Sequence, residues 1–399
     1  MSEGTSNLEL KVVFPIKLIS WSVSGTNYDS TTTPILLQNQ NGPCPLIALV
    51  NTLILQFDFR NSQPDNGLLS QSEKQYEGIK NLKSKLVAHY HKSRSVELDD
   101  VLSLVADLLL VYSEDVSIIT PEMVDHILQQ LPKLHTGLDV DPNLTDGNFS
   151  QDLATTLFEI FDLRFKHGWV VDASGVATSG YADDEVDNQH ANESPLEILH
   201  ELQTFDKVQD YLLLQDTNPT VVENQHAIRQ WLDATCSQLT IQGLNKLDLD
   251  LASPQFIIFF RNNHFNTLFK KSRNEFYLLV TDSSFQSKSS RLVWQSLNSV
   301  SGEDDIFFTG DFMPVLDINQ DIGQEIETFD SDLMLSRQLQ EEEDQAIARR
   351  MQEKYEKRNR HDKATNANTT KTEIKPSLKP SSKPVEEKKK RKFFGFLSR

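Results

Sequence analysis

The sequence predicts an α+β fold, and three observations carry this prediction. Helical patterns fill much of residues 73–161, whereas β-branched and aromatic residues gather late, at 254–285. Helices followed by a block of strands are typical of an α+β domain. The third observation is that residues 46–55 are apolar on nearly every side of a helix, which indicates a helix in the middle of the domain. With 399 residues, of which 38% are hydrophobic, the chain can form a sizeable core.

The first half of the chain is predicted to begin with strands and to continue as helices. Residues 10–21 are rich in β-branched and aromatic residues and predict one or two strands. The polar stretch 22–33 leads to a short apolar run and an Asn-Gly-Pro turn, after which a helix begins at about Cys44. Further helical patterns follow at Glu73–Ser93, Leu98–Tyr112, Pro121–Gln130 and Gln151–Phe161.

The second half of the chain is predicted to hold the main strands. Residues 173–195 are strongly polar and predict an exposed loop. Helical character resumes at Ala227–Thr240, which makes Cys236 a packed helical residue without a catalytic role. Two apolar strings follow, PQFIIFFRNNHFNTLFK and EFYLLVTDSSF, and we expect them to form a hairpin of buried strands. The domain should end near Val315.

The composition changes after this domain, which we bound at residues 1–317. Residues 318–331 form an acidic linker that is short of large apolar residues. Residues 332–358 form a continuous helical pattern without Gly or Pro. The Lys-, Thr-, Ser- and Pro-rich residues 359–399 cannot bury a core and are predicted to be a disordered basic tail.

The net charge and the cysteine content exclude several classes of protein. The formal charge is −19, yet from Tyr355 onward 14 basic residues stand against 5 acidic ones, so the rest of the chain carries −28. Such an acidic body repels phosphates, and we expect no nucleic acid partner. Two cysteines give no disulfide framework, and the N-terminus has no secretory signal. We therefore expect a cytoplasmic protein, with the nucleus left open.

Cys44 is the candidate nucleophile. A lone cysteine is more often a small buried hydrophobe, but a thiol at a helix N-terminus has a lowered pKa and a larger reactive thiolate fraction. Gln38, six residues upstream, can donate its amide N–H to the oxyanion of a tetrahedral intermediate, beside the backbone N–H of Cys44. Without Cys44, Gln38 would be interpreted as a surface amide in a turn.

His264 is the candidate base, because a single Cys and a distant His are the pattern of a thiol protease. A histidine on an apolar strand is more often a packed residue, but His264 follows three polar residues, Arg261 to Asn263, inserted into a buried strand. Asp282 on the following strand is the candidate that orients the imidazole. No metal-ligand spacing, phosphate loop or Gly-x-Ser-x-Gly elbow occurs, so we expect no metal and no cofactor.

The strings QNQNGPCPLIALVNTL, FFRNNHFNTL and YLLVTDSSF resemble the MINDY deubiquitinases, and the resemblance extends over residues 8–315. It implies a papain-like cysteine protease core in which Cys44 is the nucleophile, His264 the proton acceptor and Gln38 the oxyanion-stabilising amide. It also implies hydrolysis of isopeptide bonds in polyubiquitin, with a preference for lysine-48-linked chains.

The helix at 332–358 contains one pattern twice, at an offset of twelve residues. On a helix each copy makes a narrow stripe, and twelve residues turn the second stripe by about 120°. A solvated amphipathic helix is the ordinary interpretation, but the pattern resembles the ubiquitin-binding MIU helix. Ser336 replaces the usual Ala of that motif, and Lys354 replaces an acid. The predicted ubiquitin contacts are Leu335, Ser336, Leu339, Gln340, Ile347, Ala348 and Met351.

The last residues, KKKRKFFGFLSR, combine consecutive cations with apolar anchors. They are typical of a solubilising or nuclear-import tail, and alternatively of weak attachment to an anionic membrane. Three functions follow for the whole chain, which we expect to be a monomer. The first is an active deubiquitinase that binds polyubiquitin. The second is a non-catalytic polyubiquitin adaptor, and the third is a cysteine protease for another ubiquitin-like modifier.

Overall fold

The computed structural model describes residues 11–23, 30–38, 45–62, 72–115, 120–172, 197–285 and 291–315. The chain divides into two units, Met1–Glu325 and Ile326–Arg399, and all described residues belong to the first. Cys44, the polar loop predicted at 173–195, the MIU-like helix and the basic tail lie outside the described residues.

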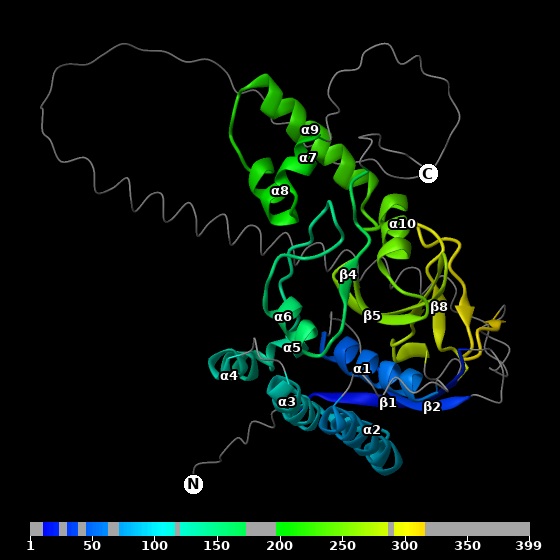
Figure 1. Cartoon of the computed structure of the whole chain (residues 1–399). Coiled ribbons are helices and arrows are strands. Elements are labelled where there is room, and N and C mark those ends of the chain that lie inside the picture. Colours follow the sequence, from blue (N-terminus) through cyan, green and yellow to red (C-terminus); the bar gives the residue numbers. More distant parts are fainter. Residues whose placement is uncertain are drawn as a thin grey trace, which may run out of the picture. The chain divides into compact units, whose positions relative to one another are not determined.

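Two sheets build this unit (Figure 1). The smaller is antiparallel, has the order β2-β1-β3, and consists of β1 (Val13–Trp21), β2 (Thr31–Leu36) and β3 (Ser95–Glu97). The larger has seven strands in the order β10-β9-β8-β7-β6-β5-β4. Its neighbours are antiparallel except for the parallel pair β4 and β5. Its strands are β4 (Phe165–His167), β5 (Gln255–Arg261), β6 (His264–Ser272), β7 (Glu275–Leu279), β8 (Trp294–Ser296), β9 (Phe307–Phe308) and β10 (Pro314–Val315).

Several of the helices start at side chains that cap the first backbone N–H groups. Ser72 and Gln75 form a capping box at the start of α2, Thr120 precedes a proline at the start of α4, and Asp152 caps α6. The helices are α1 (Pro45–Ser62), α2 (Glu73–Ser93), α3 (Leu98–Asp115), α4 (Pro121–Gln130), α5 (Lys133–Thr136), α6 (Leu153–Ile160), α7 (Glu197–Leu202), α8 (Phe205–Leu212), α9 (Pro219–Ala234) and α10 (Ile241–Asp250).

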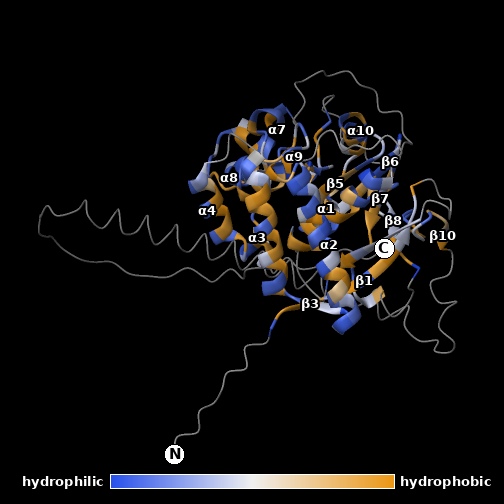
Figure 2. Cartoon of the chain, turned by 60° about the horizontal axis from the view of Figure 1, so that its bottom comes forward, coloured by the Kyte–Doolittle hydropathy of each residue, from blue (hydrophilic) through white to orange (hydrophobic). Residues whose placement is uncertain are grey.

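Helix α1 is the centre of the core, as its sequence predicted. It packs against β2 on one side and against β5 and β6 on another, and α2 also contacts it. Every residue from Pro45 to Leu55 is buried. The helices farther out, such as α2 and α3, have one apolar and one polar face (Figure 2). Within the part of the chain that the structure describes, no helix combines the length and apolar character needed to cross a membrane.

The α+β prediction is confirmed, and the helices predicted at 73–93 and 121–130 have those bounds. Four details were wrong. Strand β2 begins at Thr31, inside the stretch interpreted as polar, because its β-branched threonines pair with β1. The helix predicted at 227–240 is the end of α9, and Thr240 caps a separate helix, α10. The helices α7 and α8 were not predicted.

The fourth error concerns the predicted hairpin. The string PQFIIFFRNNHFNTLFK is itself a hairpin of β5 and β6, and EFYLLVTDSSF begins a third strand, β7. Asn262 and Asn263 have φ angles of 50° and 58°, the left-handed values that a two-residue type I′ turn requires. Asparagine tolerates this conformation better than most residues, so the polar insertion before His264 is a turn.

Candidate active site

Two contacts fix the direction of α1 relative to β2. Near the helix end, Asp58 accepts a hydrogen bond from the hydroxyl of Thr33 on β2. About two turns closer to the start of the helix, on the same side, Asn51 contacts the backbone of Leu36. From the first contact to the second, the chain goes back by seven residues in α1 and forward by three residues in β2. Both spans are about 10 Å long. Helix and strand run antiparallel, so the chain after Leu36 lies toward the start of α1.

Two further contacts fix the direction of α1 relative to β6. The ring of Phe59 lies 6.5 Å from that of Phe269, edge to face, and the hydroxyls of Thr52 and Thr267 lie 2.9 Å apart. From the first contact to the second, the residue numbers fall in both α1 and β6. The helix and the strand therefore run in the same direction and begin at the same end. From the Thr52–Thr267 contact, the start of the helix is seven residues away and His264 is three residues away, about 10 Å in either case.

Three segments predicted from the sequence therefore converge. They are Gln38 after β2, the N-terminus of α1 at Pro45, and His264 at the start of β6. Cys44 is the residue immediately before Pro45 and lies outside the described residues. The N-terminus of α1 itself has unpaired N–H groups and the positive end of the helix dipole, which stabilise a nearby negative charge.

The backbone at Leu37 and Gln38 is held by β1 and by the segment that follows β7. Leu37 still donates its N–H to the carbonyl of Pro15 in β1, over 2.8 Å. The N–H of Gln38 then donates to the carbonyl of Thr281 over 2.8 Å, and its carbonyl accepts from the N–H of Ser283 over 3.0 Å. These bonds make a parallel bridge between Gln38 and Asp282. These backbone bonds fix the chain at Gln38.

His264 is half-buried and follows a turn that is anchored from outside its hairpin. Arg261, its partner across the turn, donates Nε to the carbonyl of Ser237 over 2.9 Å and Nη2 to that of Val300 over 2.8 Å. The N–H of Asn262 donates to Oε1 of Gln238 over 2.9 Å. The first residue of β6 therefore has a fixed position relative to two neighbouring loops.

Asp282 is exposed and lies beyond the end of β7. Its Oδ1 accepts a hydrogen bond from the N–H of Ser284 over 2.7 Å. The β6–β7 ladder pairs Leu268 with Leu278, and the same register continued by four residues would put His264 opposite Asp282. The bridge brings Asp282 beside Gln38, and its role as the group that orients His264 stays a prediction.

The second cysteine differs from the prediction. Cys236 is exposed and follows Thr235, the C-cap of α9, so it is neither packed nor helical. Helix α9 ends before it, and the chain turns there toward the cap of α10. It directly precedes Ser237 and Gln238, which anchor the turn before His264.

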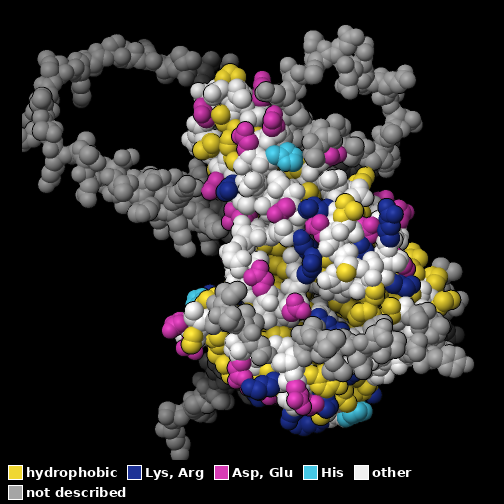
Figure 3. All heavy atoms as spheres, viewed as in Figure 1, with side chains coloured by type: hydrophobic (Ala, Val, Ile, Leu, Met, Phe, Trp, Pro, Cys, Tyr) yellow, Lys and Arg dark blue, Asp and Glu magenta, His cyan; other side chains and the backbone are white. Residues whose placement is uncertain are grey.

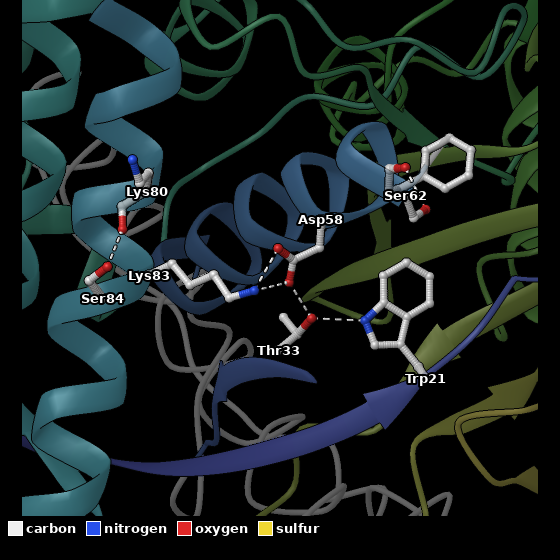
Figure 4. Close-up of polar contacts among 8 residues, drawn as sticks. Trp21, Thr33, Asp58, Ser62, Lys80, Lys83 and Ser84 are labelled. Carbon is white, nitrogen blue, oxygen red and sulfur yellow. Dashed lines mark hydrogen bonds and ion pairs between the residues drawn. The ribbon is translucent and has the colours of Figure 1, made fainter. Parts of the chain in front are cut away.

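The far end of α1 carries a buried polar network (Figure 4). Lys83 on α2 donates to both carboxylate oxygens of Asp58, each over 2.7 Å. Thr33 donates to the same carboxylate and accepts from Nε1 of Trp21 over 2.8 Å. Burial raises the pKa of Asp58 above its usual range, although the bonds from Lys83 and Thr33 oppose this. The network joins α1 to α2 and to the small sheet.

The described surface carries charges of both signs. Acidic and basic side chains are interspersed over the face that Figure 3 shows. Among the described residues, no group of three or more His, Cys, Asp or Glu side chains is arranged to hold a metal ion.

Comparison with known proteins decides the family. A family model described as MINDY deubiquitinase matches residues 13–312, which include Gln38, Cys44, His264 and Asp282. The chain belongs to the MINDY deubiquitinase family. Membership makes it a deubiquitinase of the cysteine type, as the resemblance implied.

Curated relatives agree with this assignment. Ubiquitin carboxyl-terminal hydrolase MIY1 of Saccharomyces cerevisiae is 29% identical over 83% of this chain and 86% of its own length. Ubiquitin carboxyl-terminal hydrolase MINDY-1 of Bos taurus is 32% identical over 70% of this chain and 51% of its own. MINDY-2 of Homo sapiens is 27% identical over 86% of this chain and 52% of its own. The chain thus matches about half the length of these mammalian relatives.

Proposed function

We propose that this MINDY deubiquitinase hydrolyses the isopeptide bonds of lysine-48-linked polyubiquitin, with Cys44 as nucleophile, His264 as base and Gln38 as oxyanion donor. The observation that supports these roles is the convergence of β2, α1 and β6, which brings Gln38 and His264 to the end of α1 where Cys44 precedes Pro45. The names of the relatives are consistent with this substrate class, since both relatives are called ubiquitin carboxyl-terminal hydrolases.

The reaction proceeds in two halves. His264 accepts the proton of the Cys44 thiol, and the thiolate adds to the carbonyl carbon of the isopeptide bond. The carbonyl electron pair moves to oxygen, where the Gln38 amide and the backbone N–H of Cys44 donate to it. When this intermediate collapses, the lysine amine leaves with the proton from His264, and a thioester to the ubiquitin C-terminus remains. Water then attacks the thioester, His264 takes the proton of the water, and Cys44 receives it when the ubiquitin carboxylate leaves.

The preference for long chains is proposed from the helix at 332–358, whose two stripes would each bind one ubiquitin. Tethering these sites to the catalytic domain raises the effective concentration of the chain at the active site. The proposed contacts are the seven residues predicted above. Leu335 is an apolar residue of the first stripe, and Ile347 is the corresponding residue of the second. We also propose that the protein acts as a cytoplasmic monomer.

The test is cleavage of diubiquitin and tetraubiquitin of each linkage by the full chain. We expect cutting of lysine-48-linked chains, faster for the tetramer, and complete loss in Cys44→Ala. Cys236→Ser is the matched control, because it removes the other thiol, and it should keep full activity. Gln38→Leu should lower kcat by about 100-fold or more through the lost oxyanion donor. Chain binding without cleavage of any linkage would refute the proposal and favour the adaptor.

The contribution of the helix at 332–358 is tested separately. Leu335→Ala combined with Ile347→Ala should remove the advantage of tetraubiquitin over diubiquitin and leave diubiquitin cleavage unchanged. Equal loss on both substrates would contradict the tethering argument.

A further inference from the structure

Helix α1 carries two adjacent buried polar side chains in a run of apolar ones. Asn51 and Thr52 are both 0% exposed, and residues 45–50 and 53–55 are apolar and buried. A helix that is apolar on all sides packs well in several rotations and axial positions, because hydrophobic burial is not directional. A buried amide or hydroxyl is different, since it must find its partner at one place. These two side chains therefore restrict how α1 sits between the sheets.

Asn51 replaces a missing strand at the edge of β2. In the order β2-β1-β3 the strand β2 is at the edge, and the N–H of Leu37 points to β1. The N–H and carbonyl of Leu36 consequently point away from β1. The N–H of Leu36 donates to Oδ1 of Asn51 over 2.8 Å, and Nδ2 of Asn51 donates to the carbonyl of Leu36 over 3.0 Å. One amide thus satisfies both backbone groups at the strand end, two residues before Gln38.

Thr52 lies about 100° around the helix from Asn51 and makes a polar contact to the other sheet. Its hydroxyl lies 2.9 Å from that of Thr267 on β6, and Thr267, 1% exposed, also reaches the carbonyl of Ala48 at 3.5 Å. His264 lies three residues before Thr267 on the same strand. Consecutive helix residues hence contact the two strands that carry the proposed oxyanion donor and the proposed base.

We propose that Asn51 and Thr52 are positioning residues that fix the start of α1 relative to Gln38 and His264. This inference rests on the proposed function of Cys44. Pro45 lies about 9 Å along the helix from Asn51, and Gln38 lies about 7 Å along the strand from Leu36. Over such short and regular spans, a slide or rotation of α1 at Asn51 passes directly to Cys44. A misplacement of about 1 Å in a reacting group lowers a rate by up to about 100-fold.

The variants should separate positioning from stability. Asn51→Leu keeps the size of the side chain and removes both bonds to Leu36, and Thr52→Val removes one hydroxyl contact. Thr52→Ser keeps the hydroxyl and is the rescuing variant. Thr33→Val is the matched control, because it breaks a buried threonine contact of the same helix at its far end. All are made in Cys236→Ser, so that Cys44 is the single thiol.

Two quantities are measured on each folded variant, below its unfolding temperature. The first is kcat and KM on lysine-48-linked tetraubiquitin, and the second is the pH profile of Cys44 alkylation by iodoacetamide. We expect Asn51→Leu to lower kcat about 10- to 100-fold and Thr52→Val about 3- to 10-fold, with KM within about 3-fold. Both should move the alkylation profile toward higher pH. Thr52→Ser and Thr33→Val should stay within about 2-fold of the parent.

The outcomes are distinct. If Thr33→Val lowers kcat as much as Thr52→Val, or if Thr52→Val matches the parent, the contacts only stabilise the fold and the inference is overturned. If Asn51→Leu does not fold, the Thr52→Val and Thr52→Ser pair decides by itself. Absence of cleavage in the parent, or cleavage that survives Cys44→Ala, refutes the proposed function instead.

Discussion

His167 on β4 is predicted to make the protein sensitive to mild acid. It is 2% exposed, and both ring nitrogens have backbone partners. Nδ1 accepts the N–H of Trp169 over 3.1 Å, so the ring proton is on Nε2, which donates to the carbonyl of Asn148 over 2.9 Å. A second proton would sit on Nδ1, opposite an N–H donor. Burial, the largest cause, lowers the pKa of His167 from 6.5 to about 4, while the carbonyl of Asn148 opposes this shift.

The sign and size of the effect follow from linkage. Because the folded pKa is lower than the unfolded one, the unfolded chain binds more protons between these values, and the unfolding free energy falls as the pH falls. The contribution of His167 is complete above pH 6.5 and is lost as the pH approaches 4. With the values 6.5 and about 4, the loss is about 2 kcal/mol between pH 7 and pH 5, and about 3 kcal/mol by pH 4.

Urea denaturation at pH 7 and at pH 5 measures this loss. His167→Gln keeps a donor and an acceptor without titrating, so its unfolding free energy should fall by about 2 kcal/mol less than that of the wild type over this interval. His126→Gln is the control, because His126 is exposed on α4, and its pH dependence should match the wild type. Equal pH dependence of wild type and His167→Gln would refute the assignment of His167 as a buried neutral group.

Three further predictions concern cations that are buried or half-buried. Burial lowers the pKa of Lys17 to about 8. Its contribution to the free energy of unfolding should therefore rise by about 3 kcal/mol between pH 8 and pH 10.5, because the unfolded chain binds the additional proton in this interval. Urea denaturation of Lys17→Met should lack this rise. Lys83→Met leaves Asp58 buried without its cation and should cost about 3 kcal/mol of unfolding free energy. Adding Asp58→Asn should recover most of that cost, and no recovery would contradict the pairing. Arg261→Lys cannot reach both carbonyl anchors and should lower kcat about 10-fold with KM unchanged, whereas a normal kcat would show that the turn before His264 needs no anchor.

Much of the fold could be predicted because local and tertiary preferences agree in it. The helix α2 begins at a capping box that is visible as Ser72 and Gln75, and α4 begins at Thr120 followed by a proline. Helix α1 was predictable because apolar residues on all sides have one place to go. The helices α7 and α8 were missed, since each spans at most eight residues and gains its burial from a cluster that includes Trp169 and Trp231.

The catalytic roles of the site residues stay predictions, and their geometry could be predicted only in part. Gln38 and His264 stand out by residue type, and the structure brings the strands that carry them to the same end of α1. The Asn-Asn pair before His264 was misread, although two residues that tolerate positive φ between apolar runs are a hairpin signal. The bridge between Gln38 and Asp282 had no signal, because it joins two sheets through backbone groups that every residue possesses.

The buried polar contacts of α1 explain why the rest could not be predicted. In the sequence, Asn51 and Thr52 interrupt an apolar run, and residue type alone does not distinguish a tolerated polar residue from one with a partner. Their meaning comes from Leu36 and Thr267, which are 15 and 215 residues away along the chain. A helix that carries a nucleophile between two sheets needs directional contacts on both sides, because apolar packing alone leaves its axial position to small differences in shape. Polar residues buried in such a helix are therefore the ones that we expect to fix its position, and they are the residues to test first.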